Sequence, residues 1–199
     1  VRLHNRREAR RFERWPEQPQ AEFLAPQGYE PVYRSNAVTR HGEHGNALLS
    51  RWPVLAHQHE DMSDHRFEQR GLLHTEVQLA GRTVHVLVVH LGLVPASRVR
   101  QVVQLEDYIR REIAQADPVI VAGDFNDWGQ GLTRQLARAG LHEFEGARTP
   151  TYPARLPLAQ LDHVYTRGLR PVSVMVPQGR IWRQMSDHLP LVAELAWLD

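Results

Sequence analysis

Four short segments place Asp, Asn or His at the end of an apolar run or just inside one. They are Gly123-Asp124-Phe125-Asn126-Asp127 after residues 119–122, His90 after residues 86–89, Asp162-His163 within an apolar stretch, and Ser186-Asp187-His188 before the last one. Ionisable groups at strand ends are held rigidly and are partly desolvated, which favours catalysis. Carboxylate, amide and imidazole groups in one place could move protons and bind a phosphate or a metal ion.

Each segment alone has a simpler explanation. An Asp-Phe-Asn sequence after a strand is typical of a turn in which Asp and Asn cap backbone amides. A single His at a strand end is often only an edge residue, and Ser-Asp-His before a strand can be a plain turn. Four such segments, all at the mouths of apolar strands, indicate a functional set rather than four unrelated turns.

The composition narrows the class of protein. With 199 residues, 42% of them hydrophobic and 24% charged, the chain is in the ordinary globular range and predicts one domain over residues 1–199. The net charge of +1 argues against a protein held to nucleic acid mainly by bulk charge. All 24 basic residues are arginine, the better bidentate partner for phosphate. Without cysteine, thiolate nucleophiles, disulfides and cysteine-based zinc sites are excluded.

The sequence shows no apolar run of ~18 residues and so predicts no transmembrane segment. The lack of cysteine fits a cytoplasmic protein, the location we expect, although it also fits many secreted ones. No feature indicates an obligate protein partner.

Hydrophobic periodicity predicts the elements that position these residues. Helices are expected at residues 5–15, from Pro95 with an apolar face of Val102, Leu105, Ile109 and Ile113, and at 130–139 with Gly140 at its end. Strands are expected at residues 1–3, 29–34, 47–52, 71–79, 83–90, 119–122, 161–166, 172–176 and 189–198. A Gly/His loop with His41, His44 and Gly45 separates the second and third, and residues 119–122 look buried on both faces. The mixture of hairpins and helical crossovers favours an α/β sandwich.

The segments resemble the endonuclease/exonuclease/phosphatase superfamily. The resemblance rests on Gly123-Asp124-Phe125-Asn126, Ser186-Asp187-His188, Val89-His90-Leu91-Gly92, Gly45-Asn46-Ala47-Leu48-Leu49-Ser50-Arg51 and the intervening Leu161-Asp162, in matching order over residues 1–199. It implies a four-layer α/β/β/α sandwich of two packed mixed sheets with the active site at one end. The family's early strand Asn and metal-binding Glu have no counterpart, so we expect the first strand and helix to be missing from an N-terminally incomplete domain.

By this resemblance the protein is a divalent-metal-dependent phosphoesterase that uses Mg²⁺ or Mn²⁺. Asp124 would orient and deprotonate the attacking water, and Asn126 would donate a hydrogen bond to a phosphoryl oxygen. His188, tuned by Asp162, would contact the phosphate. Asp187 would lie at the metal or next to the residues that bind it, and His90 would contact the phosphate or protonate the leaving oxygen.

Other residues and the substrate leave alternatives open. Asn46 would lie near the substrate or simply cap a loop, and Arg70 would face phosphate or form a surface ion pair. His41 and His44 are expected to be solvated loop residues, because no third metal ligand is near them in the sequence. The substrate could be a phospholipid head group, a soluble phosphodiester or phosphomonoester, or nucleic acid, with duplex DNA not favoured. A catalytically inactive phosphate- or nucleic-acid-binding module with the same pocket is the alternative function.

Overall fold

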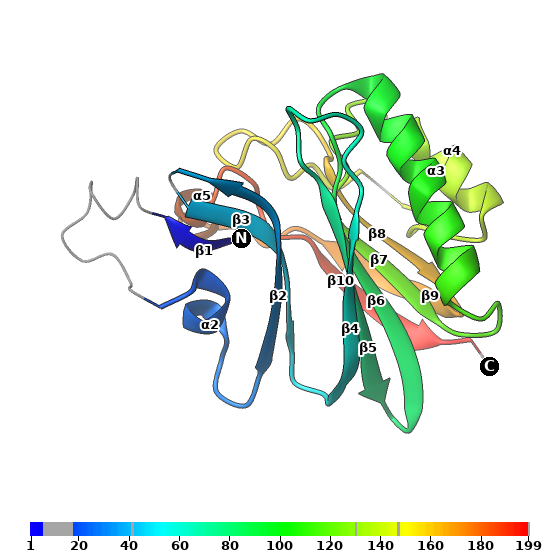
Figure 1. Cartoon of the computed structure of the whole chain (residues 1–199). Coiled ribbons are helices and arrows are strands. Elements are labelled where there is room, and N and C mark those ends of the chain that lie inside the picture. The colour runs from blue at the N-terminus through cyan, green and yellow to red at the C-terminus, as the bar shows by residue number, and fades with distance from the viewer. Residues whose placement is uncertain (6–17, 41, 130, 147, 199) are drawn as a thin grey trace. The chain divides into compact units, whose positions relative to one another are not determined.

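Figure 1 labels the helices and strands of the protein in a computed structural model, which describes residues 1–5, 18–40, 42–129, 131–146 and 148–198. The chain divides into two units, Val1–His90 and Leu91–Asp199. That residues 1–199 form one domain stays a prediction. The helix expected at 5–15 falls outside the described residues, except for Asn5, which ends a strand.

The first unit contains a three-stranded antiparallel sheet in the order β1-β3-β2. Its strands are β1 (Arg2–Asn5), β2 (Glu30–Thr39) and β3 (Gly42–Ser50), and the short helix α2 (Gln20–Leu24) precedes β2. The strands expected at 1–3, 29–34 and 47–52 are confirmed, and β2 and β3 are longer than predicted.

The Gly/His loop predicted between these strands is wrong for His44 and Gly45, and His41 lies outside the described residues. His44 and Gly45 belong to β3, where Gly45 pairs with Ser35 and His44 with Ala37, so the register shifts between Ser35 and Ala37. A Cβ on Gly45 would collide with the backbone of Arg34. Glycine is therefore present because two strands approach closely at the bulge, and not because the chain turns. His44 is half-buried, and burial lowers its pKa.

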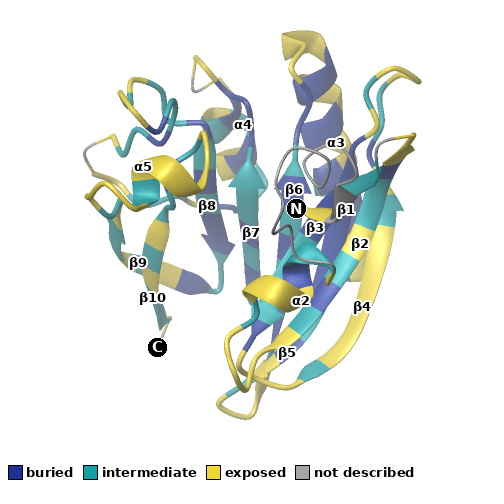
Figure 2. Ribbon diagram, turned by 90° about the vertical axis from the view of Figure 1, so that its left-hand side faces the viewer, coloured by how far each residue is buried: buried dark blue, intermediate teal, exposed yellow. Residues whose placement is uncertain are grey.

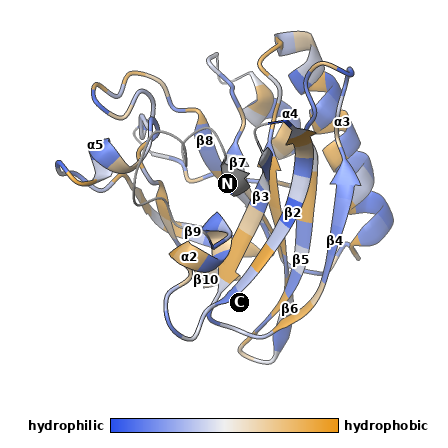
Figure 3. Cartoon of the chain, turned by 60° about the vertical axis from the view of Figure 1, so that its left-hand side comes forward, coloured by the Kyte–Doolittle hydropathy of each residue, from blue (hydrophilic) through white to orange (hydrophobic). Residues whose placement is uncertain are grey.

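The second set of strands in this unit is an antiparallel run of β4 (Val54–Asp61), β5 (Gly71–Leu79) and β6 (Arg82–His90). The predicted hairpin of residues 71–79 and 83–90 is confirmed. Strand β4 was not predicted; it is mostly exposed and hydrophilic, whereas β5 is largely buried (Figures 2 and 3). Asn46 links the two sets, because its Nδ2 donates hydrogen bonds to the Gly71 and Val88 carbonyl oxygens at 2.7 and 2.9 Å.

The described part of the second unit contains two antiparallel strand pairs and three helices. The pairs are β7 (Val119–Asp124) with β8 (Asp162–Arg167), and β9 (Leu169–Met175) with β10 (Val192–Trp197). The helices are α3 (Pro95–Glu112), α4 (Leu132–Arg138) and α5 (Trp182–Met185). Helices α3 and α4 and all four strands are as predicted, whereas the single turn of α5 was not predicted.

The apolar face predicted for α3 is confirmed, since Val102, Leu105, Ile109 and the following Ile113 are all buried. The expectation that residues 119–122 are buried on both faces is wrong in part. Val119 and Val121 are fully buried, but Ile120 and Ala122 are half-exposed. The strand therefore has one completely covered face. Among the described residues, no helix is long and apolar enough to cross a membrane.

Candidate active site

Two aspartates face each other at one end of the β7–β8 pair. Asp124 is the last residue of β7 and Asp162 the first of β8, and the register of the two antiparallel strands pairs them directly. Directly opposed residues have Cβ atoms about 4.5–5.5 Å apart. Both side chains keep partial contact with solvent, at 18% exposure for Asp124 and 23% for Asp162.

The segment after β7 is a tight turn that holds Asp124 in place. Gly123 has a φ of 148° and Asn126 a φ of 49°, and glycine and asparagine are the residues that accept such angles most readily. The Asn126 backbone N–H donates to Asp124 Oδ1 at 2.8 Å. Phe125 is fully buried and packs edge-on against Tyr165, which anchors the turn in the core. Asp124 can therefore cap the turn and also serve in a functional site. Its Oδ1 atom accepts the bond from the turn, and Oδ2 is not used to cap it.

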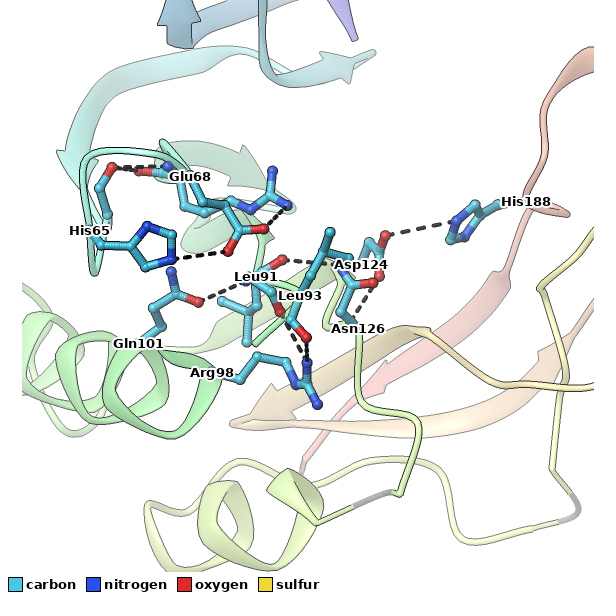
Figure 4. A network of polar contacts seen from close by, with 12 residues as sticks. His65, Glu68, Leu91, Leu93, Arg98, Gln101, Asp124, Asn126 and His188 are labelled. Carbon is cyan, nitrogen blue, oxygen red and sulfur yellow. Dashed lines mark hydrogen bonds and ion pairs between the residues drawn. The ribbon is translucent and has the colours of Figure 1, made fainter. Parts of the chain in front are cut away.

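A second loop, residues 91–94, is fixed beside this turn (Figure 4). The Leu91 N–H donates to the Asp124 carbonyl oxygen at 2.9 Å, and Asn126 Nδ2 donates to the Leu91 carbonyl oxygen at 3.0 Å. From α3, buried Arg98 donates to the Gly92 and Leu93 carbonyl oxygens, and Gln101 Oε1 accepts from the Gly92 N–H. Arg98 and Gln101 are therefore positioning residues for this loop. They were not predicted, because their spacing shows only that they share one face of α3 and not what that face contacts.

His188 lies between the two aspartates. Its Nδ1 is 2.8 Å from Asp162 Oδ2. Its Nε2 is 3.8 Å from Asp124 Oδ2, the contact drawn in Figure 4. The chain around it is held by backbone bonds, since the Leu189 N–H donates to Thr151 and the Ala154 N–H donates to Asp187. The predicted set Asp124, Asp162 and His188 is thus brought together from three segments distant in the sequence.

The carboxylates around His188 favour its charged form. The hydrogen bond with Asp162 raises the pKa of His188 above its usual value, and the charges of Asp162, Asp124 and Asp187 act in the same direction. Burial opposes this shift but is outweighed. An imidazolium flanked by carboxylates in a half-buried site is a suitable partner for a phosphate oxygen.

Asp162 and its neighbour His163 point to opposite faces, as successive residues of a strand do. Asp162 faces His188, whereas His163 is fully buried with its Nδ1 2.7 Å from Glu143 Oε1. Gln160 Nε2 donates to the same Glu143 oxygen at 2.9 Å. Nearby, a cavity of about 460 Å³ in this unit is lined by Glu143 and Gln160, among other residues. His163 is therefore part of the interior rather than of the candidate active site.

A row of aromatic rings adjoins His188 and was not predicted. The Tyr152 ring centroid lies 4.9 Å from that of His188, and Trp128 packs edge-on against Tyr152 at 5.7 Å. Trp128 is 61% exposed, an unusual state for so large an apolar ring. Trp128 lies two residues after the Asp-Phe-Asn motif, and this closeness in sequence was the available signal. Tyr152 is distant from the motif in the sequence, so no comparable signal pointed to it.

The remaining predicted residues differ in what surrounds them. Asp187 is exposed, and its Oδ1 accepts a hydrogen bond from Ser186 Oγ at 3.3 Å. Asn46, Arg70 and His90 belong to the first unit. Asn46 binds two backbone carbonyls there, and Arg70 forms a 3.0 Å ion pair with Glu68 in which both side chains are largely buried. The substrate roles of these three residues stay predictions.

The donor atoms around His188 suit a hard cation. Asp124 and Asp187 offer carboxylate oxygens, which Mg²⁺ and Mn²⁺ prefer over nitrogen or sulfur. Asp162 is already engaged by His188, so it is less suited to binding an ion. Among the described residues, Asp124, Asp162, Asp187 and His188 do not form a group of three or more ligand atoms close enough to share an ion. Asp187 therefore stays the predicted metal ligand, and the metal-binding Glu that the resemblance implies has no counterpart in the sequence.

Comparison with known proteins places this geometry in a family. Residues 12–188 match the model of the Endonuclease/Exonuclease/phosphatase family. The protein YbhP of Escherichia coli K12, named as uncharacterised, is 38% identical over 191 residues, which is 92% of this chain and 75% of YbhP.

Two solved structures share the fold. An endonuclease/exonuclease/phosphatase family protein from Leptotrichia buccalis superposes with a TM-score of 0.72 at 14% identity, covering 94% of this chain and 81% of the other. The mannosyl-6-phosphatase Bt3783 of Bacteroides thetaiotaomicron superposes with a TM-score of 0.68 at 18% identity, covering 86% and 78%. These likenesses confirm the predicted α/β fold class. The family match covers most of the chain and includes every residue of the site, from Asp124 to His188, and so the protein belongs to the endonuclease/exonuclease/phosphatase family.

Proposed function

We propose that the protein is a divalent-metal-dependent phosphoesterase that hydrolyses phosphoester bonds by in-line attack of water. The observation that carries the proposal is the position of His188, hydrogen-bonded to Asp162 on one side and 3.8 Å from Asp124 on the other. That second separation is longer than a hydrogen bond, so a water molecule can donate to Asp124 Oδ2 while a phosphoryl oxygen accepts from His188 Nε2 beside it.

The charge on His188 defines its part in the reaction. Because the hydrogen bond with Asp162 raises its pKa, the ring keeps its proton to higher pH than a free histidine does, which makes it less suited to act as the base. A protonated Nε2 can instead donate to a phosphoryl oxygen and offset the negative charge that grows there. Asp162 then acts as a positioning residue, since it binds Nδ1 and aims Nε2 outward.

Asp124 is left as the group that handles the attacking water. Its Oδ1 accepts from the Asn126 backbone, which fixes the carboxylate and leaves Oδ2 on the His188 side. In the proposed step the water oxygen bonds to phosphorus, its proton passes to Asp124 Oδ2, and the bond from phosphorus to the leaving oxygen breaks. By the family resemblance, His90 would contact the phosphate or protonate the leaving oxygen.

Asn126 has a structural task beside the one proposed for it. One of the two Nδ2 hydrogens goes to the Leu91 carbonyl oxygen, so a single N–H remains to donate to a phosphoryl oxygen. Loss of Asn126 would therefore disturb the loop at residues 91–94 as well as remove a donor.

Asp187 is the residue that would hold Mg²⁺ or Mn²⁺, while Asp124 Oδ2 takes the proton of the attacking water. When bound, such an ion neutralises the charge that develops on the phosphoryl oxygens. The aromatic row of Trp128 and Tyr152 supplies an apolar surface beside His188, which favours a substrate with an organic group next to the phosphate.

Hydrolysis of bis-p-nitrophenyl phosphate and of p-nitrophenyl phosphate tests the proposal. With Mg²⁺ or Mn²⁺ we expect release of p-nitrophenol from one or both substrates, and EDTA should abolish it. General acid–base residues typically contribute ~10²–10⁴-fold to the rate, and His188→Gln should lower kcat by at least an amount in this range.

Two results would contradict the proposal. Turnover that is the same in EDTA would remove the metal from the mechanism. Phosphate binding by calorimetry, without hydrolysis of any diester or monoester in a wider panel, would favour the inactive binding module instead.

A further inference from the structure

Outside the residues of the candidate active site, two histidines and a glutamate gather on one face of the β5–β6 hairpin. His74 and Glu76 are two apart on β5, so both point to the same face of the sheet. Glu76 pairs directly with His85 on β6, and His74 pairs with Leu87, two residues further along β6 from His85. The three side chains are thus direct or diagonal neighbours across the strand pair.

Their ligand atoms are close enough to share an ion. One nitrogen of each imidazole and a Glu76 carboxylate oxygen all lie within 4.8 Å of one another. His74 Nε2 and His85 Nδ1 are 2.9 Å apart, and the ring centroids are separated by 5.1 Å. Both histidines are buried, at 2% and 6% exposure, whereas Glu76 is half-exposed and gives the group a side open to solvent.

A shared hydrogen bond between the rings is the simplest account of the pair, and it requires one ring to donate and the other to accept. The accepting nitrogen is therefore unprotonated, and unprotonated imidazole is the form that binds metals. The half-exposed carboxylate beside two buried imidazoles is an additional feature that a hydrogen-bonded pair does not need.

We propose that His74, Glu76 and His85 form a binding site for a divalent transition-metal ion, with Zn²⁺ as the best-fitting ion. Two imidazole nitrogens and one carboxylate oxygen, with water in a fourth position, are a common zinc ligand set. Zinc–nitrogen bonds of about 2.0–2.1 Å in a tetrahedral site set the two nitrogens roughly 3.3 Å apart, so a small movement of the rings admits the ion. The ion would replace the proton between the rings.

The ligands distinguish this site from the one proposed for catalysis. Imidazole nitrogen favours zinc, copper or nickel, whereas the carboxylates of Asp124 and Asp187 favour magnesium or manganese. An ion here would cross-link β5 and β6 and stabilise the hairpin. The pairing of β5 with β6 that brings the three ligands together is fixed by the two-residue turn of Ala80 and Gly81, both of which have a positive φ.

The test is zinc binding to the whole chain at pH 7.5, after stripping with a chelator and measurement of bound metal following dialysis. We expect one zinc per chain that an excess of Mg²⁺ does not displace, and a rise in Tm when zinc is added. Glu76→Gln should weaken zinc affinity by at least about tenfold, the lower end of the loss that even an outer-shell change brings. With Co²⁺ as the probe, the visible absorption of a four-coordinate site should appear in the wild type and be reduced in Glu76→Gln.

Three further variants make the result decisive. Glu60→Gln changes a half-exposed glutamate on β4 and should leave zinc binding unchanged. Asp124→Asn should keep the zinc and lose hydrolysis, which separates this site from the proposed function. His85→Gln should abolish binding, and its far-ultraviolet circular dichroism reports whether it folds. Less than about 0.2 zinc per wild-type chain, or equal zinc affinity in Glu76→Gln and the wild type, would overturn the proposal.

Discussion

The charge on His188 depends mainly on one hydrogen bond. Asp162 accepts from Nδ1 at 2.8 Å, and this bond is the largest cause of the raised pKa. In Asp162→Asn the ring loses both the bond to a carboxylate and the attraction to its charge, so the pKa of His188 should fall. Proton NMR titration of the ring measures this directly. An unchanged His188 pKa in Asp162→Asn would show that Asp162 does not tune the ring.

The same shift makes activity and stability depend on pH in a defined direction. A histidine whose pKa is raised on folding stabilises the folded state fully below its unfolded pKa of about 6.5, and this stabilisation is lost as pH rises through the folded value. If protonated His188 assists the reaction, the alkaline limb of kcat/KM should lie at lower pH in Asp162→Asn. An acid limb that moves instead would mean that neutral His188 is the active form.

Asp124 offers a clean test of the water-activating group. Asp124→Asn keeps an oxygen able to accept from the Asn126 backbone, so the turn should persist while the base is lost. We expect kcat to fall by ~10²–10⁴-fold with a smaller change in KM, because the proton moves in the transition state. Asp107→Asn, on the exposed side of α3, is the matched control and should retain full activity.

The double variant of Asp124→Asn and His188→Gln tests whether the two residues act together. They are 3.8 Å apart at their nearest charged atoms, so they should serve the same phosphorus. Residues that act as a unit show losses smaller than the product of the single losses. A fully multiplicative loss in steady-state kinetics would mean independent action.

At the scale of elements, the β5–β6 hairpin contains a residue poorly suited to its turn. Ala80 has a φ of 52° and precedes Gly81 at 79°, the backbone of a type I′ turn for which Asn-Gly is preferred. A left-handed conformation costs a residue such as alanine about 1–2 kcal/mol, and asparagine bears it more easily. Ala80→Asn should therefore raise the free energy of unfolding by about 0.5–1 kcal/mol.

Urea denaturation measures this change. Ala116→Asn, at an exposed position where φ is not positive, is the control and should be neutral within about 0.5 kcal/mol. A loss of stability in Ala80→Asn would mean that contacts of the alanine methyl group outweigh the strain of its backbone.

Elements with a clear hydrophobic periodicity could be predicted from the sequence, and elements without one could not. Helix α3 and the β5–β6 hairpin were predictable, because apolar spacing and a two-residue turn define them. Strand β4 was missed because it is exposed and has little alternation, and tertiary pairing alone makes it a strand. The glycine and histidine residues around Gly45 indicated a loop. The segment is instead a strand, in which glycine is needed because β2 approaches closely.

For the candidate site, too, local features of the sequence could be predicted and contacts between distant segments could not. Strand ends identified Asp124, Asp162 and the segment before β10, since those positions are local features of the sequence. The contact of His188 with Tyr152 comes from backbone bonds between the segments at 151–154 and 186–189. Pairings of that kind join distant loops and leave no periodic signal, so Tyr152 could not be found before the fold was known.

At the scale of the whole molecule, charge is nearly balanced. The chain has 24 basic and 23 acidic residues, and the basic ones are all arginine. Several of these arginines already serve internal bonds. Arg70 pairs with Glu68, Arg98 binds the loop at residues 91–94, and Arg110 pairs with Asp107. Arginine content alone is therefore a poor guide to affinity for nucleic acid, because paired guanidinium groups add little to binding of external phosphates.

Near-neutral charge predicts weak, weakly salt-dependent binding to duplex DNA. Each phosphate that a protein neutralises contributes about −0.9 to the slope of log K against log salt, and non-specific binders typically reach Kd values of ~10⁻⁴–10⁻⁶ M. For a 20-base-pair duplex at 150 mM salt, fluorescence anisotropy should give a Kd no tighter than ~10⁻⁴ M. Excess duplex should also leave hydrolysis of a small phosphodiester unchanged, since the compact site of Asp124 and His188 needs no groove contacts. A micromolar Kd with a steep salt slope would contradict this expectation and make nucleic acid the favoured substrate class.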